Sequence, residues 1–494
     1  MTDDSSQLIA WLPELIYRAG RFESGLALVC DAAGNIARIV SVDQLTGERR
    51  INLPRRAMLP GMVNAHSHAF QRVIRGKTEY RNEDKSPDSF WTWRELMYSA
   101  ATRLTPEDIY DASRMAFLEM ALSGITAAGE FHYLHHAPDG SSYDDPNLLA
   151  GEVIRAAGDV GLRIALLRVA YARSGFQTEV NPKQARFIEA DADIYLRNFE
   201  RLASSVNSGY AHVSRASRSD ENSTPEERVP NDTAWVGVAP HSVRAVPLDY
   251  LKRVIGYANE HDLKVHMHVA EQPAEVSACV EEYGRTPVAL LHTEGLLNEQ
   301  FTAVHAIHVT PKAIASFAET RALVCACPTT ERNLGDGVVP ADEYLKHGVS
   351  VCLGTDSHAQ IDLFEDARQL EYHLRLQKLE RAVLDQTSQV PSLKSQELAR
   401  RLFDCATVNG ARSIGAPGGV LDSGKPADFF TVDIDDPTIA GAGKDLLPAI
   451  VFSASRAAIR EVAVGGKPIV SEGQHLMQED IVERFNELQK RLWS

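Results

Sequence analysis

The middle of the chain alternates between two kinds of hydrophobic pattern. Short apolar runs are mostly followed by longer segments in which apolar residues recur at helical spacing. This alternation is typical of βα units, in which each strand of a parallel sheet is followed by a helix. The expected strands lie at residues 57–68, 124–133, 162–171, 234–242, 263–269, 301–309, 322–328 and 349–357. These strands predict an α/β fold, a (β/α)8 TIM-like barrel.

The two ends of the chain show a different pattern, with short strand-like runs separated by glycine turns. We expect both ends to build one small β-sandwich domain. An amphipathic helix should close the chain, because Ile481, Phe485, Leu488 and Leu492 recur at helical spacing. The predicted boundaries are 1–58 and 417–474 for the two parts of the sandwich, 59–416 for the barrel and 475–494 for the helix.

Composition and charge narrow the classes of function. The 494 residues are 44% hydrophobic and 24% charged, as in ordinary globular proteins. A formal net charge of −16 argues against nucleic acid or an anionic membrane as the partner. The start "MTDDSSQL" lacks a signal-peptide pattern and no run of about 18 apolar residues occurs, so we expect a cytoplasmic protein. The six scattered cysteines are expected to be reduced and mostly buried.

Histidine and carboxylate residues gather at the predicted C-terminal ends of the strands, where barrels of this kind carry their chemistry. His66 and His68 end the first strand, and alternate side chains of a strand point to the same side. His268 ends the fifth strand and Asp356 follows the eighth. These four residues predict a site for one divalent metal ion per chain with room for a water molecule. We expect Zn²⁺, although the same ligands suit Fe²⁺.

Each of these residues also has an ordinary structural explanation. His266 lies one pleat deeper than His268, where a buried hydrogen-bonded histidine is expected, and His308 in the predicted sixth strand is interpreted in the same way. Glu271 is either a proton-transfer group or an acid in the first turn of a helix. His305 is either a catalytic histidine or a satisfied residue of the barrel.

This arrangement of HxH, His and Asp resembles the metal pattern of the amidohydrolase superfamily. The resemblance implies a distorted barrel with a small β-sandwich made from both chain ends. Dinuclear members carry a carboxylated lysine on strand four, but residues 234–242 contain no lysine. The resemblance therefore implies a single metal ion, and the mononuclear branch is rich in deaminases.

Longer motifs resemble one family closely, the N-formimino-L-glutamate deiminases of histidine degradation. The matching segments occur in the family's order and are "GMVNAHSHAFQR", "DSFWTWRELMY", "EFHYLHH", "GVAPHSVRAV", "HVAEQ", "VHAIHV", "CPTTERNLGDG" and "GTDSH". The substrate of this family has one formimino carbon and two carboxylates. The resemblance implies that the glutamate part is held by Gln71, Arg94, Tyr133, His241 and Arg244.

The resemblance also implies the catalytic roles. A bound metal ion makes hydroxide available from water near neutral pH. Asp356 is expected to take the proton of the water, His305 to steady the developing oxyanion, and Glu271 to protonate the leaving nitrogen. The products are ammonia and N-formyl-L-glutamate. Dimers are usual in this family, so a homodimer is expected.

Other functions stay open at this point. The chain is either this deiminase or another mononuclear aminohydrolase that acts on a nucleobase, a triazine or another formimino amino acid. Arg94 and Arg244 favour a substrate with two carboxylates, since guanidinium groups bind carboxylates through two parallel hydrogen bonds. The polar segment 214–232 is expected to be a solvated loop that can reshape one side of the pocket. A non-enzymatic barrel is disfavoured by the retention of all four metal ligands.

Overall fold

The computed structural model describes residues 8–79, 90–178, 181–208, 233–385 and 394–494. The polar segment 214–232 lies outside the described residues. None of the described helices is long and apolar enough to cross a membrane.

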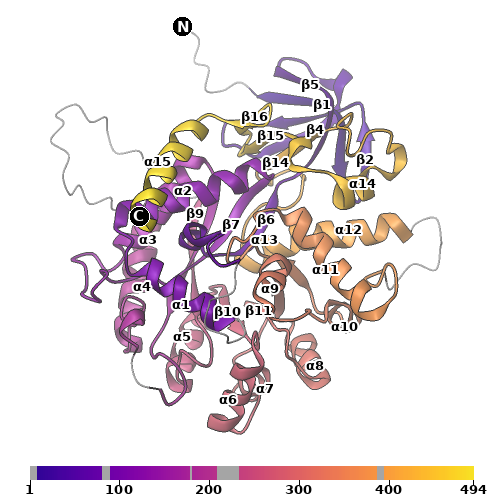
Figure 1. The fold of residues 1–494 in the computed structure, drawn as a ribbon. Helices are drawn as coiled ribbons and strands as arrows, with labels where there is room; N and C mark the ends of the chain where they lie inside the picture. The colour runs from indigo at the N-terminus through magenta and orange to yellow at the C-terminus, as the bar shows by residue number, and fades with distance from the viewer. Residues whose placement is uncertain (1–7, 80–89, 179–180, 209–232, 386–393) are drawn as a thin grey trace, which may run out of the picture.

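Eight parallel strands form the central sheet, as the alternating pattern predicts. They pair in chain order, and an isolated parallel bridge between Ser67 and Asp356 joins the last strand to the first. The chain is therefore an α/β barrel (Figure 1). The strands are β6 (Met62–Ser67), β7 (Ile125–His132), β8 (Arg163–Ala170), β9 (Ala234–Pro240), β10 (Val265–Val269), β11 (Phe301–His305), β12 (Leu323–Ala326) and β13 (Val351–Leu353).

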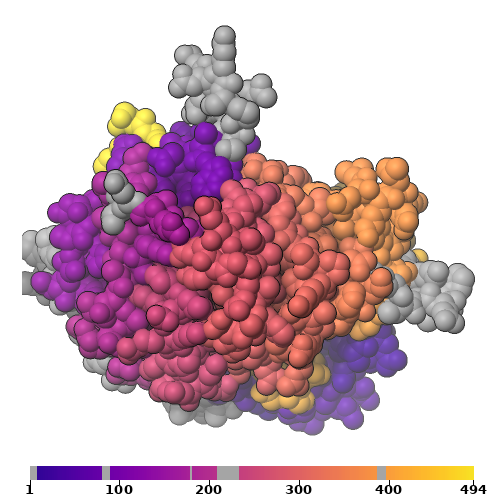
Figure 2. Space-filling view, turned by 90° about the horizontal axis from the view of Figure 1, so that it is seen from below, coloured from indigo at the N-terminus to yellow at the C-terminus, as the bar shows by residue number. Residues whose placement is uncertain are grey.

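Helices follow most of these strands and cover the outside of the barrel (Figure 1). Figure 2 shows the face seen from below, on which successive parts of the chain follow one another from purple through red to orange. The starts of the helices carry ordinary signals, such as the capping box of Thr105 and Asp108 and the proline at the first helical position of α2 and α8. The helices are α1 (Phe90–Ala101), α2 (Pro106–Leu122), α3 (Leu148–Val160), α4 (Ala192–Asn207), α5 (Leu248–Glu260), α6 (Pro273–Tyr283), α7 (Pro287–Thr293), α8 (Pro311–Thr320), α9 (Pro328–Leu334), α10 (Ala341–Lys346), α11 (Leu363–Lys378), α12 (Lys394–Ala406) and α13 (Val408–Ile414). Short 3-10 helices are η2 (Val42–Gln44), η3 (Ala69–Ile74), η4 (Pro182–Gln184), η5 (Gly443–Asp445) and η6 (Arg456–Ala458).

The two chain ends build one separate mixed sheet of nine strands, shown in indigo and yellow in Figure 1. Strand β5 (Arg49–Pro60) joins the two ends, because it pairs parallel with β1 (Ile9–Arg18) and antiparallel with β14 (Phe429–Asp433). The other strands are β2 (Arg21–Ser24), β3 (Leu26–Cys30), β4 (Ile36–Ser41), β15 (Ile459–Val464), β16 (Lys467–Ser471) and β17 (Gln474–His475). Helix α14 (Leu446–Ser453) lies between β14 and β15 in the chain.

The C-terminal helix α15 (Gln478–Trp493) has the predicted amphipathic pattern, and its four apolar residues are buried. Arg484 of this helix pairs with Asp111 of α2. Gln489 and Trp493 both donate hydrogen bonds to the backbone carbonyl of Val73, at 2.9 and 3.2 Å. Helix α15 thereby supports η3, the turn that directly follows His68.

Three predicted strands differ from the observed ones by more than two residues at one end. The run 349–357 is a strand only in β13 (Val351–Leu353), so Asp356 lies in the loop after the strand. The run 57–68 is divided at Gly61 between β5 of the terminal sheet and β6 of the barrel. The run 301–309 ends at His305, because His305 and Ala306 have φ values of 68° and 49° in the left-handed region. His308 therefore lies in the loop after the strand and not within it, which corrects the sequence-based interpretation.

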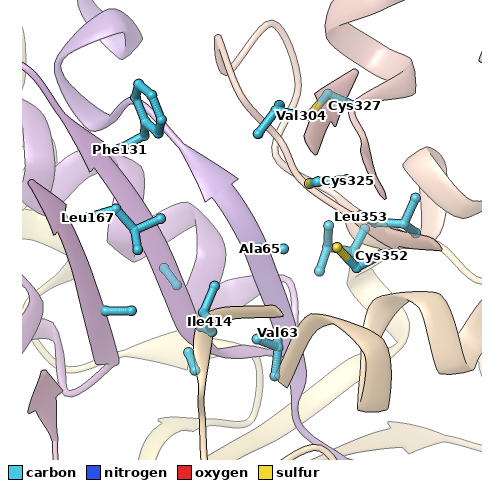
Figure 3. Packing of buried hydrophobic residues seen from close by; sticks show 14 of the residues in the cluster. Val63, Ala65, Phe131, Leu167, Val304, Cys325, Cys327, Cys352, Leu353 and Ile414 are labelled. Atoms are coloured by element: carbon cyan, nitrogen blue, oxygen red, sulfur yellow. The ribbon is translucent and has the colours of Figure 1, made fainter. Parts of the chain in front are cut away.

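Buried apolar side chains fill the interior between the strands (Figure 3). Cys325 and Cys352 lie opposite each other on β12 and β13 and pack among residues such as Val304 and Leu353. All six cysteines are buried and none forms a disulfide. The prediction that the thiols are mostly buried is confirmed.

Candidate metal centre and active site

Four ligand atoms converge where strands β6, β10 and β13 end. The Nε2 atom of His66 lies 3.1 Å from Nε2 of His68 and 3.1 Å from Nε2 of His268. Asp356 Oδ1 lies 3.1 Å from Nε2 of His68 and 3.5 Å from Nε2 of His66. Ligands at about 2.05 Å from a tetrahedral zinc ion lie about 3.3 Å apart, so these distances fit one ion. All four side chains are buried.

The hydrogen bonds of the histidine rings favour the metal-binding form. Nδ1 of His68 donates to the carbonyl of Phe131 at 2.9 Å, and Nδ1 of His268 donates to the carbonyl of His241 at 3.2 Å. A ring that donates from Nδ1 presents the lone pair of Nε2. Burial lowers the pKa of His66 to about 3, which keeps this ring neutral as well. Lone pairs 3.1 Å apart repel unless a cation lies between them, so the residues fit a divalent ion.

Closure of the barrel sets the position of two ligands. The amide of His68 donates to the carbonyl of Asp356, and the amide of Asp356 donates to the carbonyl of His66. Gly354 permits this close approach, since a Cβ atom there would lie 2.7 Å from the Cβ of His66. Asp356 has a φ of 45°, a strained conformation of the kind found at functional sites.

Two of the expected catalytic side chains, His305 and Glu271, lie beside the candidate metal ligands, and the third, Asp356, is itself one of these ligands. Nε2 of His305 lies 3.6 Å from Oε1 of Glu271 and 3.6 Å from Oδ2 of Asp356. Asp356 thus directs one oxygen to the histidine ligands and the other to His305. Glu271 immediately precedes Gln272, the N-cap of α6. Burial raises the pKa of Glu271, which suits it to carry a proton.

Glu331 of α9 lies against His305, and the sequence interpretation gave it no role. Its Oε1 lies 3.2 Å from Nδ1 of His305 and also accepts the amide of Cys327 at 2.8 Å. Burial alone lowers the pKa of His305, but the carboxylates of Glu271, Glu331 and Asp356 outweigh it and raise this pKa to about 10. In the sequence, Glu331 looks like an ordinary acid in the first turn of a helix.

A second buried network supports the metal ligands from behind, and it was also missed. Oε2 of Glu130 accepts a hydrogen bond from the Ser67 hydroxyl at 2.5 Å, and Oε1 accepts the amide of Ala69 at 2.7 Å. The Ser67 hydroxyl also lies 3.1 Å from Nε2 of His358. The only sequence signal for this network is a glutamate inside an otherwise apolar strand, "ITAAGEFH".

Two further histidines form hydrogen bonds away from the ligand cluster. His266 is fully buried, and its Nε2 lies 3.0 Å from the carbonyl of Ser413, as expected for a residue one pleat deeper than His268. His308 donates to the carbonyl of Asp336 at 2.8 Å.

The five residues expected to hold the substrate line one pocket with His68, His268, Glu271 and Asp356. They are Gln71, Arg94, Tyr133, His241 and Arg244. Gln71 donates to the hydroxyl of Tyr133 at 2.8 Å, and its buried Oε1 has no partner among the described residues. The ring of His241 lies 4.8 Å from that of His268, so this residue connects the pocket with the metal cluster.

Arg94 and Arg244 place two positive charges in this pocket. Arg94 is 9% exposed and contacts the hydroxyls of Tyr98 and Tyr171. Within the part of the chain that the structure describes, neither arginine forms an ion pair with a carboxylate. A buried cation without a counter-ion is costly, so the pocket is complementary to an anion.

Comparisons with known proteins identify the family of this chain. A sequence model of the amidohydrolase family matches residues 57–469. A formimidoylglutamate deiminase of Pseudomonas aeruginosa is 36% identical over 480 residues, which are 96% of this chain and 96% of that protein. A 5-methylthioadenosine/S-adenosylhomocysteine deaminase of Pyrococcus abyssi is 26% identical over 89% of this chain and 88% of its own length. The crystal structure of an amidohydrolase from Brucella melitensis superposes with a TM-score of 0.85, at 31% identity, over 99% of this chain and all of that one.

Three findings lead to one assignment. They are the match of the family model, the extent of the similarity to the deiminase, and the barrel with its terminal sheet. The resemblance seen in the sequence motifs is thereby confirmed. This chain belongs to the amidohydrolase family and is a hydrolase that acts on carbon–nitrogen bonds.

Proposed function

We propose that this enzyme hydrolyses N-formimino-L-glutamate to N-formyl-L-glutamate and ammonia in histidine degradation. One observation carries the proposal. Arg94 and Arg244 line the pocket that contains the ligand cluster and the acid–base residues, and neither has a carboxylate partner among the described residues. Two guanidinium groups are suited to hold the two carboxylates of a glutamate derivative. The similarity to the deiminase of Pseudomonas aeruginosa supports the same substrate.

His66, His68, His268 and Asp356 would hold one divalent ion, for which we propose Zn²⁺. Bound there, the ion would lower the pKa of a water molecule and supply a nucleophile at neutral pH. The enclosing residues define where that water would lie. Oδ2 of Asp356 and Nε2 of His305 both face the space beside the ligand cluster.

The side chains can divide the proton transfers of the reaction. The water oxygen forms a bond to the formimino carbon while Asp356 accepts a proton from the water. His305, as an imidazolium, stabilises the negative charge on that oxygen, because its pKa is raised to about 10. Glu271 gives its proton to the terminal nitrogen. When the bond between carbon and that nitrogen breaks, the proton held by Asp356 passes to the nitrogen, which leaves as ammonia. The remaining hydroxyl proton passes to Glu271, so the carbonyl of the formyl product forms and both carboxyl groups return to their starting state.

A deaminase that acts on a neutral heterocycle is the alternative, since adenosine-type deaminases also resemble this chain. Such a substrate would leave the buried charge of Arg94 without a counter-ion. The anionic substrate therefore accounts better for this pocket.

The test is ammonia release by purified protein whose metal content has been measured. The substrates are N-formimino-L-glutamate, N-formimino-L-aspartate, N-formyl-L-glutamate, guanine, cytosine and 5′-methylthioadenosine. We expect selective turnover of N-formimino-L-glutamate. Absence of that turnover in protein with a full equivalent of metal, or faster turnover of a heterocycle, would overturn the proposed substrate.

A further inference from the structure

Arg94 and three side chains around its guanidinium form a cluster at one side of the pocket. Nε of Arg94 donates to the hydroxyl of Tyr98, and Nη2 donates to the hydroxyl of Tyr171 at 3.4 Å. Gln184 of η4 lies behind both phenols, and its Nε2 donates to Tyr98 at 2.5 Å and to Tyr171 at 2.7 Å. Three separate parts of the barrel, α1, the end of β8 and η4, therefore meet at this point.

The hydrogen-bonding groups of this cluster do not balance. Arg94 offers five N–H groups, Gln184 two and each phenol one, and the acceptors are the two phenol oxygens and one amide oxygen. Donors outnumber acceptors whichever way the amide of Gln184 is turned. All four side chains are buried, with 9% or less of each exposed. The surplus of donors belongs to the guanidinium of Arg94, which lines the pocket, so an acceptor on a bound ligand can complete its hydrogen bonds.

The position of the two phenols indicates what that acceptor is. Tyr98 and Tyr171 line the same pocket as Arg94, and the ring of Tyr171 lies 4.7 Å from that of His241. Burial raises the pKa of Tyr98, so this phenol keeps its proton and can donate it. A carboxylate has two oxygens that each accept more than one hydrogen bond, and it carries the charge that Arg94 lacks.

We infer that Tyr98 and Tyr171 bind the same substrate carboxylate as Arg94 and act as specificity-determining residues, while Gln184 positions them. This inference rests on the proposed function. It extends that function by adding two tyrosines to the site in which Arg94 binds a substrate carboxylate. A neutral group at this position would leave the cluster without a compensating charge. The cluster thereby selects for a dicarboxylate over a substrate that lacks one carboxylate.

The variants Tyr98→Phe and Tyr171→Phe remove one hydroxyl each and keep the ring. We expect each to raise the KM for N-formimino-L-glutamate about tenfold with little change in kcat, because a hydrogen bond to a charged group is lost. Gln184→Glu would place a carboxylate beside Arg94 and should raise KM more than either phenylalanine. Tyr195→Phe is the matched control, since its buried hydroxyl donates to the carbonyl of Arg168, outside the pocket.

Two substrate analogues distinguish tyrosines that bind a substrate carboxylate from tyrosines that only support the fold. N-formimino-L-glutamine lacks the side-chain carboxylate, and 4-formimidamidobutanoate lacks the α-carboxylate. If the phenols bind one carboxylate, each phenylalanine variant lowers kcat/KM for the parent compound and for the analogue that keeps this carboxylate. The same variants have little effect on kcat/KM for the analogue that lacks this carboxylate. Equal losses with all three compounds, or an unchanged KM for the parent compound, would overturn the inference.

A binding measurement keeps this test independent of the proposed reaction. Glutarate, a plain dicarboxylate, is titrated calorimetrically into the metal-loaded wild type and into each variant. If the wild type does not hydrolyse N-formimino-L-glutamate, the proposed substrate fails. Glutarate binding that weakens about tenfold in both phenylalanine variants, but not in Tyr195→Phe, would still support the carboxylate site. Unaltered binding in those variants would overturn it.

Discussion

The imidazole of His305 is held from behind by the carboxylate of Glu331, with 3.2 Å between Nδ1 and Oε1. The opposite nitrogen of the ring therefore points toward Glu271 and Asp356. Because the backbone of His305 has a φ of 68°, the strand ends at this residue. The contact with Glu331 then orients the side chain. A carboxylate that orients a histidine in this way also stabilises its charged form.

The change Glu331→Gln should therefore lower kcat about 10- to 100-fold, the range typical of groups that orient a reactive histidine. The metal content should stay the same, because Glu331 does not contact the four ligands of the main cluster. Steady-state kinetics and metal analysis of the same preparation measure both effects. Glu319→Gln, which changes an exposed carboxylate on α8, is the control. A variant with wild-type kcat would contradict this role.

Replacement of Glu271 by glutamine should abolish proton transfer to the leaving nitrogen. We expect kcat to fall about 10²- to 10⁴-fold, the usual contribution of a general acid or base. The metal site should remain intact, since Glu271 lies outside the group of His66, His68, His268 and Asp356. Unchanged turnover with a full equivalent of metal would exclude the assigned role.

A methyl group at Gly354 should displace His66 and thereby disturb the metal site. The added Cβ would lie 2.7 Å from the Cβ of His66 and 2.9 Å from its carbonyl oxygen, so strand β6 must shift. We expect Gly354→Ala to bind much less metal at equal protein concentration, as measured by elemental analysis. Gly256→Ala is the control, because nothing lies within 4 Å of its added Cβ. Full metal loading of Gly354→Ala would refute the close-approach argument.

The buried ion pair of Arg168 and Glu189 should make the free energy of unfolding fall as the pH becomes acidic. Burial raises the pKa of Glu189, but Arg168, at 2.6 Å, outweighs burial and lowers this pKa from 4.5 to about 2. A lowered pKa in the folded state adds stability above the unfolded value of 4.5, and that stability is lost as the pH falls toward 2. The shift corresponds to on the order of 3 kcal/mol.

Unfolding by urea between pH 6 and pH 3 measures this effect. The difference in stability between wild type and Glu189→Gln should shrink as the pH falls, because protonation removes the same charge in the wild type. Glu95→Gln affects an exposed pair with Lys183 and should change stability by less than about 1 kcal/mol at either pH. A constant difference for Glu189→Gln across this range would contradict the assignment.

The local part of the metal site could be predicted because strand geometry alone determines it. His66 lies in β6 and His68 directly follows the strand, so the two residues are two apart at the strand end and share a side. The positions of His268 and Asp356 followed from their place at strand ends. The alternation of strand and helix likewise predicted the barrel. The division of 57–68 at Gly61 and the early end of β11 at His305 were not predicted, because both depend on contacts with other elements.

Residues that support the site from other elements could not be found in the same way. Glu331 and Glu130 each look ordinary in their own segment, and only the folded barrel brings them to His305 and Ser67. The sequence by itself determined the fold class, the four candidate metal ligands and the family, because periodicity and short motifs carry that information. Only the tertiary structure decided which distant side chains meet around Arg94, because long-range packing and closure of the barrel set those distances.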